Sequence, residues 1–213
     1  GAMSLEENRI LGIAMGTSEA AGYVDGDGNI TGWLNELAFV PVDAAPGAAV
    51  DEWSGDIGCG VKYFSQDGVI KLAPAAGIEL DESLSPAEKL KVVQGLMENG
   101  DERAEAVYRS IGTYLAHALA LYYDFYAFKH VLLLGRVMSG EGGDIVIAEA
   151  RRVQLQNAAR QLRPPGRIVD RQAHCRIHDV AGGIGHLLGM HPEPDRIEAG
   201  VPLPQPQAGV LAL

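Results

Sequence analysis

Apolar and polar positions at the start of the chain follow the pattern of short strands. Residues 11–15 form an uncharged apolar run of the kind seen in buried strands. A polar turn at 16–18 follows, strand character resumes at 22–25, and a third apolar run covers 30–34. Strands joined by turns as short as these predict a β-meander.

Helical signals begin further along. Residues 61–73 have a helical pattern, which we expect Pro74 to close. Ser85, Pro86 and Glu88 have the spacing of an N-terminal capping box with proline at the first helical position. A second helix is therefore predicted to begin at this point.

The longest predicted helix begins after Asp101, and its apolar positions recur every three or four residues. These positions are Val107, Ile111, Leu115, Ala118 and Tyr122. We interpret the aromatic cluster at 122–126 as a continuation of this buried stripe, not as a stacking platform for a ligand. A homodimer interface is a further possible use of the helix around 107–122.

A strand, a glycine-rich loop and a helix follow in this order. The strand is read at 130–137, the loop at 139–144 and the helix at 145–161. This arrangement presents a helix N-terminus to a ligand at the carboxyl edge of a sheet. Beyond the helix the pattern weakens, with one short strand expected within 167–179 and an extended or partly disordered tail over 164–213.

Composition and charge argue against several classes of protein, namely nucleic-acid-binding, membrane-spanning and disulfide-rich proteins. The chain has 213 residues, 47% of them hydrophobic, which is enough for a sizeable core. Its net charge of −11 argues against nucleic-acid binding, because that needs clustered Lys and Arg. No apolar run reaches the length of a membrane span. Two cysteines are too few for a disulfide framework, so we expect a cytoplasmic protein.

No metal site is predicted from the residues. Cys59 has no second Cys or His at ligand spacing nearby, so a packed thiol is the better interpretation. Several histidines gather around Cys175, but they lie on no recognisable element: His174, His178, His186 and His191.

Two segments carry candidate binding chemistry. A turn of the type Gly16-Thr17-Ser18 lets backbone N–H groups and hydroxyls converge on an anion, most often a phosphate. An ordinary hairpin turn is the alternative. Glu36, a carboxylate between apolar neighbours, is either an exposed edge residue, which is slightly favoured, or a ligand for hydroxyl groups in a cleft.

In their order these pieces resemble the C-terminal lobe of the ROK family (repressor, open reading frame, kinase), within the actin–hexokinase–chaperone ATPase superfamily. The first turn is similar to the family's second phosphate loop, Gly-Thr-Gly-x-Gly-x-Gly. Gly16, Thr17 and Gly22 match that loop, whereas Ser18 and Ala20 replace two of its glycines.

Further segments extend the resemblance. Residues 35–39 lie where the family has Glu-x-Gly-His, so Glu36 matches the sugar-contacting glutamate and Phe39 replaces the histidine. Residues 132–143 are similar to the adenosine-side strand and glycine loop, with Arg136 in a position where many members have glycine.

Residues 52–61 occupy the place of the family's zinc motif, Cys-x-Cys-Gly-x-x-Gly-Cys-x-Glu. Its glycines are kept at Gly55 and Gly58 and one cysteine at Cys59, but Glu52 and Ser54 replace the other cysteines. Together with the missing histidine, three of the four zinc ligands are absent. The resemblance therefore comes with an expectation of no zinc.

The resemblance covers residues 1–163 and implies an α/β fold, a ribonuclease H-like lobe of the actin-type ATPases. It implies that the partners are a nucleotide and a sugar, with ATP and Mg²⁺ as cofactors. The implied contacts are Gly16, Thr17 and Ser18 to the β- and γ-phosphates, Gly135 and Arg136 to the adenosine, and Glu36 with Asn35 to sugar hydroxyls.

The chain begins at Gly1, about where the family's Asn-Asp segment with the catalytic Asp would have just ended. The expected protein is thus the C-terminal lobe of an ATP-dependent carbohydrate kinase, inactive without its N-terminal lobe, and no catalytic residue is assigned here. The alternative is a regulator of the same family that senses a sugar or nucleotide without turnover. The lost zinc motif and the two lost loop glycines favour that alternative.

Overall fold

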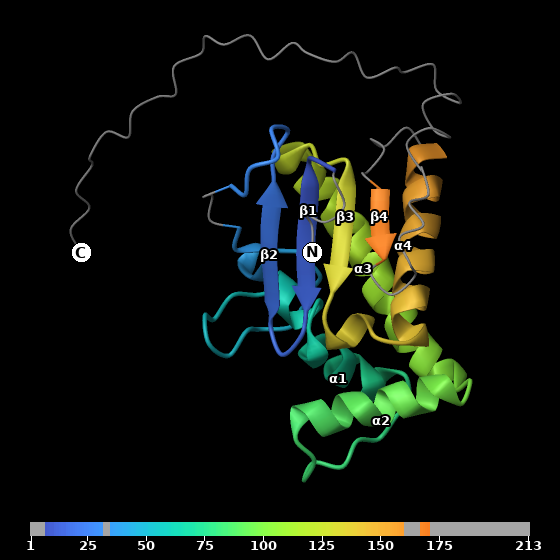
Figure 1. Ribbon diagram of the computed structural model, residues 1–213. Coiled ribbons are helices and arrows are strands. Elements are labelled where there is room, and N and C mark those ends of the chain that lie inside the picture. Colours follow the sequence, from blue (N-terminus) through green and yellow to red (C-terminus); the bar gives the residue numbers. More distant parts are fainter. Residues whose placement is uncertain (1–6, 32–34, 160–166, 171–213) are drawn as a thin grey trace, which may run out of the picture.

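The computed structural model describes residues 7–31, 35–159 and 167–170. Within these ranges a four-stranded sheet lies at the centre, in the order β2-β1-β3-β4 (Figure 1). The strands are β1 (Ile10–Met15), β2 (Glu19–Val24), β3 (His130–Leu134) and β4 (Arg167–Asp170). β2 runs antiparallel to β1, whereas β3 is parallel to β1 and β4 is parallel to β3.

The strand predictions hold in part. β1 and β2 are confirmed, with β2 beginning at Glu19 directly after the 16–18 turn. β3 is confirmed only as far as Leu134. The expected strand at 135–137 is wrong, because Gly135 has φ +99° and a 3₁₀ turn follows at Arg136–Met138. The expected third strand of the meander is described only by a bridge between Val24 and Ile30, since 32–34 lie outside the described residues. β4 lies within the stretch 167–179 where one short strand was expected, and it pairs with β3. Residues 171–213 lie outside the description.

Four helices accompany the sheet in the described ranges. They are α1 (Gln66–Ala75), α2 (Pro86–Glu98), α3 (Glu102–Tyr126) and α4 (Glu141–Ala159). Short 3₁₀ turns occur as η2 (Leu37–Phe39), η3 (Gly60–Lys62) and η4 (Arg136–Met138). No helix of this part of the chain is long and apolar enough to cross a membrane.

The predicted helix starts are correct where a local cap defines them. Ser85 accepts a hydrogen bond from the Glu88 N–H while the Glu88 side chain accepts from the Ser85 N–H, which completes the capping box. The Asp101 carboxylate caps α3 by accepting from the Arg103 N–H, at 2.9 Å.

Two helix boundaries differ from the prediction. α1 begins at Gln66 instead of 61, because Ser65 caps it and the preceding residues form η3; it also extends one residue past Pro74. α4 begins at Glu141 instead of 145, so Gly142 lies in its first turn. A Cβ on Gly142 would lie 2.5 Å from the Tyr108 ring, so the glycine permits close packing of α4 on α3 and is not a loop residue.

The core lies between one face of the sheet and the helices. On β1, Leu11, Ile13 and Met15 are fully buried against this layer, as the alternation of a strand requires. The predicted stripe of α3 is buried along its whole length. Phe125, which we expected in the core, is instead 73% exposed, because the helical period continues the stripe from Tyr122 to residue 126.

Candidate functional site

The two glycine segments identified in the sequence meet at one edge of the sheet. β1 and β3 are parallel, so the turn after β1 and the loop after β3 both lie at their carboxyl ends (Figure 1). Gly135 has φ +99°, and a Cβ there would lie 2.3 Å from the Met15 carbonyl oxygen. Only glycine fits this position, and its close approach brings the two segments together.

The N-terminus of α1 joins the same edge. The Gln66 N–H donates to the Gly16 carbonyl at 2.8 Å, which ties the helix start to the turn. The Ser65 hydroxyl donates to the Val61 carbonyl at 2.6 Å and accepts from the Asp67 N–H at 3.1 Å. The partial positive charge of a helix N-terminus thus lies beside the candidate anion site.

The turn itself leaves donors available. The Gly16 N–H donates to the Ser18 carbonyl at 3.0 Å, which closes the turn. Thr17 and Ser18 are both exposed, and among the described residues neither the Thr17 N–H nor its hydroxyl has a hydrogen-bond partner. The Ser18 hydroxyl donates to the Glu19 carbonyl at 3.5 Å. Unpaired backbone and hydroxyl donors on the exposed Thr17, beside a helix N-terminus, suit an anionic ligand.

Gly135 and Arg136 are exposed at the start of the adjoining loop. The Gln94 side chain from α2 donates to the Arg136 carbonyl at 2.9 Å, so α2 holds this loop in place. A cavity of about 130 Å³ lies between α2 and the start of α4, and Gln94, Tyr108 and Ser139 are among its lining residues. Gln94 and Tyr108 could not be predicted as site residues, since their positions on helices carry no local sign of a site.

The candidate sugar segment lies against β2. Glu36 is exposed, in agreement with the slightly favoured edge interpretation, and Asn35 is half-buried. Phe39, where the resemblance expects histidine, packs on Trp53 with ring centroids 5.7 Å apart.

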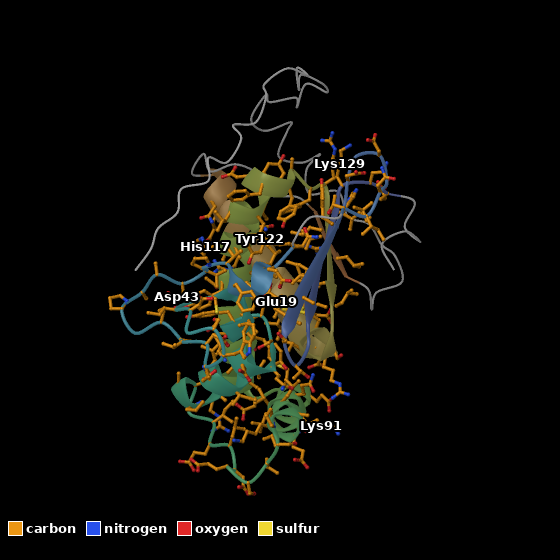
Figure 2. All side chains as sticks on the ribbon, turned by 90° about the vertical axis from the view of Figure 1, so that its left-hand side faces the viewer. Glu19, Asp43, Lys91, His117, Tyr122 and Lys129 are labelled. Carbon is orange, nitrogen blue, oxygen red and sulfur yellow. The ribbon has the colours of Figure 1, made fainter. Side chains whose placement is uncertain are left out.

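Glu19 is a site residue that the sequence analysis did not find. It follows Ser18 directly, yet its side chain is turned inward and only 5% exposed. Neither carboxyl oxygen has a hydrogen-bond partner, and burial raises the pKa of Glu19 to about 8. Figure 2 shows Glu19 and Tyr122 on the helix-covered side of the sheet. The strand alternation, which places Glu19 on the same side as Tyr23, was the available signal.

A buried ammonium, that of Lys62, directly follows the segment at 52–61 that resembles the zinc motif. The Lys62 side chain is 4% exposed and contacts three carboxylates. These are Asp51 at 3.2 Å, Asp67 at 3.0 Å, and Glu52. Burial alone would lower the pKa of Lys62, but the hydrogen bonds that its ammonium donates to the carboxylates outweigh burial, and the net shift is upward.

Cys59 in the same segment is a free, fully packed thiol, which confirms the packed interpretation. Burial raises its pKa, followed by smaller contributions from neighbouring carboxylates. In 7–31, 35–159 and 167–170, no group of three or more His, Cys, Asp or Glu side chains is placed to hold a metal ion. His174, Cys175, His178, His186 and His191 fall outside these ranges.

No protein-family model matches the sequence, and no curated protein matches it. Solved structures do. A ROK family glucokinase from Streptomyces griseus, in complex with glucose and AMPPNP, matches 76% of this chain with a TM-score of 0.57 and 17% identity. The chain has the ROK fold.

Other ROK structures agree with this assignment. A ROK family transcriptional regulator, a homologue of the E. coli MLC protein, matches 79% of the chain with a TM-score of 0.60 and 20% identity. A ROK hexokinase from Thermus thermophilus matches 75% with a TM-score of 0.55 and 19% identity. The chain covers 55%, 43% and 50% of the glucokinase, regulator and hexokinase, so it spans about half the length of these ROK proteins.

Proposed function

We propose that this chain is the C-terminal, nucleotide- and sugar-binding lobe of an ATP-dependent carbohydrate kinase. The observation that carries the proposal is the meeting of the 16–18 turn with Gly135 at the carboxyl ends of β1 and β3. The same fold occurs in a glucokinase that holds glucose and AMPPNP. A hairpin followed by parallel strands in the order β2-β1-β3-β4 supports a ribonuclease H-like, actin-type ATPase lobe.

The residues present fit the anionic end of a nucleotide. The exposed backbone and hydroxyl donors of Thr17 and Ser18 would hold the β- and γ-phosphates, beside the N-terminus of α1. Gly135 and Arg136, which are exposed at the adjoining loop, would lie on the adenosine side. ATP with Mg²⁺ supplies the transferable phosphoryl group and neutralises its charge when bound.

Glu36, with Asn35, would accept hydrogen bonds from sugar hydroxyls. The match of Glu36 to the sugar-contacting glutamate of the ROK family supports this role, and its position before η2 leaves the carboxylate accessible to a ligand. Holding the sugar and the nucleotide on one rigid lobe would position the attacked phosphorus, which is most of what phosphoryl transfer requires.

The catalytic base is proposed to lie in an N-terminal lobe that is not part of this chain. Supporting this, the chain spans about half the length of the kinases whose fold it shares. On its own it should bind but not phosphorylate. We further propose a cytoplasmic protein that forms a homodimer through α3, which multi-angle light scattering would test, a monomer counting against the dimer.

Calorimetric titration of the chain with AMPPNP tests the nucleotide site. Replacement of Ser18 and Thr17 by Ala should weaken binding about tenfold, as expected for the loss of charge-assisted hydrogen bonds. Ser83→Ala, the same change in an exposed loop, is the matched control. In the intact protein, the test is ATP-dependent phosphorylation of a panel of hexoses and amino sugars. Failure with every sugar would overturn the kinase assignment.

A sugar- or nucleotide-sensing regulator is the second candidate. It is favoured by the similarity to a ROK transcriptional regulator and by Ser18 and Ala20 in place of two loop glycines. Side chains at these positions restrict how closely the backbone approaches a phosphate. Sugar binding by the intact protein without phosphorylation would support this candidate over the kinase.

A further inference from the structure

The position of Glu19 in the fold is unusual for a carboxylate. It is the first residue of β2 and pairs with Met15, so it closes the hairpin that carries the candidate phosphate turn. Thr17, Ser18 and Ala20 around it are exposed, whereas Glu19 is buried with both oxygens shielded from solvent and without a hydrogen bond. An unpartnered buried carboxylate is costly, so a group kept in this state calls for a reason.

The carboxyl lies where two other segments of the candidate site meet. A Cβ on Gly60 would lie 2.4 Å from the Glu19 Oε2 and 2.6 Å from the Leu37 carbonyl oxygen. The Glu19 Oε2 and the Leu37 carbonyl oxygen thus both face the same side of Gly60. An ionised Glu19 carboxylate could only accept hydrogen bonds, and so could the Leu37 carbonyl beside it. The protonated Glu19 carboxyl has an O–H group that can donate a hydrogen bond to this carbonyl.

The charged and titratable groups on the neighbouring elements do not neutralise Glu19. Glu36 on η2 is exposed. The Lys62 ammonium on η3 is engaged by three carboxylates. On α3, the Tyr122 hydroxyl is buried without a partner, and its pKa is raised by burial and, secondarily, by the charge of Glu19. On β2 itself, the Tyr23 hydroxyl donates to the Tyr126 carbonyl.

We propose that Glu19 is a positioning residue that, in its protonated form, joins the phosphate turn at 16–18 to the sugar segment at 35–39. The ligand part of this inference rests on the function proposed above. Removal of the proton places a negative charge directly behind the phosphate turn and next to the Leu37 carbonyl. Both effects loosen the contact between the segments and disfavour an anionic ligand.

At neutral pH the proton is in place, because burial holds the pKa of Glu19 at about 8. A bound polyphosphate would favour the neutral carboxyl still further. By linkage, nucleotide affinity must then fall as the pH rises above 8, since binding would have to return a proton to Glu19.

Calorimetric titration with AMPPNP between pH 7 and pH 9.5 tests the ligand part. The affinity of the wild-type chain for AMPPNP should fall about tenfold over this range. This is the change expected if bound nucleotide raises the pKa of Glu19 by about one unit. Glu19→Gln, which is neutral at every pH, should show a flat profile. Glu102→Gln makes the same change at an exposed position and should behave like the wild type. Equal profiles for the wild type and Glu19→Gln would overturn the proposal.

Hydrogen exchange tests the structural part without any ligand. The Phe39 N–H donates to the Glu36 carbonyl and the Val40 N–H to the Leu37 carbonyl, both at 3.1 Å. After correction for intrinsic exchange, these amides should lose protection above pH 8 in the wild type and not in Glu19→Gln. This measurement does not depend on AMPPNP binding. If AMPPNP does not bind but protection is lost as expected, the proposed function is wrong and the structural role of Glu19 stands.

A third measurement needs no variant. The side-chain carboxyl of Glu19, followed by carbon-13 NMR in the wild-type chain, should titrate together with the amide signals of residues 37–40. Independent titration of the carboxyl and of these amides would overturn the proposed coupling.

Discussion

Replacing Glu19 by Gln should remove a pH-dependent part of the stability of this chain. In the unfolded chain the carboxyl loses its proton near pH 4.5, whereas in the folded chain burial raises the pKa to about 8. Between these values the folded state holds a proton that the unfolded state lacks. The free energy of unfolding therefore falls as the pH rises from 4.5 to 8, and this contribution is flat above and below that window.

The size of the effect follows from the same pKa difference. Each pKa unit corresponds to about 1.4 kcal/mol, so the full window amounts to roughly 3–5 kcal/mol. That is a large fraction of the stability of a typical domain. The side chain is only 5% exposed, so little of this energy is lost to solvent screening.

Urea unfolding of the wild type and of Glu19→Gln at pH 5, 6.5 and 8 gives the required comparison. All other groups titrate in both proteins, so the difference between their free energies of unfolding isolates Glu19. The two proteins should be similar at pH 5, and the variant should be more stable by roughly 3–5 kcal/mol at pH 8. A difference that does not change with pH would refute the reasoning, and Glu102→Gln serves as the exposed control.

Three further substitutions test other features. Gly135→Ala should destabilise the chain by roughly 2–4 kcal/mol in urea unfolding, because it combines positive φ with a Cβ 2.3 Å from the Met15 carbonyl oxygen. Lys62→Met should cost roughly 2–4 kcal/mol in the same assay, since the carboxylates around the ammonium lose their partner. Ser85→Ala should cost about 1 kcal/mol through the lost capping box.

Each of these has an outcome that would count against it. Wild-type stability in Gly135→Ala would mean that the loop can move away from β1. An unchanged or raised stability in Lys62→Met would show that packing outweighs the ion pairs. Unchanged stability in Ser85→Ala would show that the capping hydrogen bonds contribute nothing measurable.

Local chemistry explains which parts of the fold the sequence could predict. Ser85 and Asp101 cap their own helices within three residues, so their roles can be read without knowledge of the rest of the molecule. Glycine is unfavourable in a helix, so the sequence at Gly142 and Gly143 predicts a loop. Their positions in α4 are explained by the Tyr108 ring and the Met138 carbonyl, which lie where their Cβ atoms would be.

The residues of the candidate site also fall into two groups: those that local sequence predicts and those that only the tertiary contacts explain. The turn at 16–18 could be located because its composition is distinctive, whereas its position beside Gly135 depends on the parallel pairing of β1 and β3. Glu19 was missed because a carboxylate is normally exposed, and its burial is decided by the packing of Leu37 and Gly60. Such long-range contacts leave no mark on the neighbouring sequence.

The positive charge between the carboxylates of Asp51, Glu52 and Asp67 is the Lys62 ammonium, which is a covalent part of the chain. Unlike a bound metal ion, this ammonium cannot be removed by a chelator, lost on dilution or exchanged for a competing ion. The charge at this position also does not depend on the supply of a metal in the cell. The positive charge at this point of the molecule is therefore always present in a one-to-one ratio with the chain.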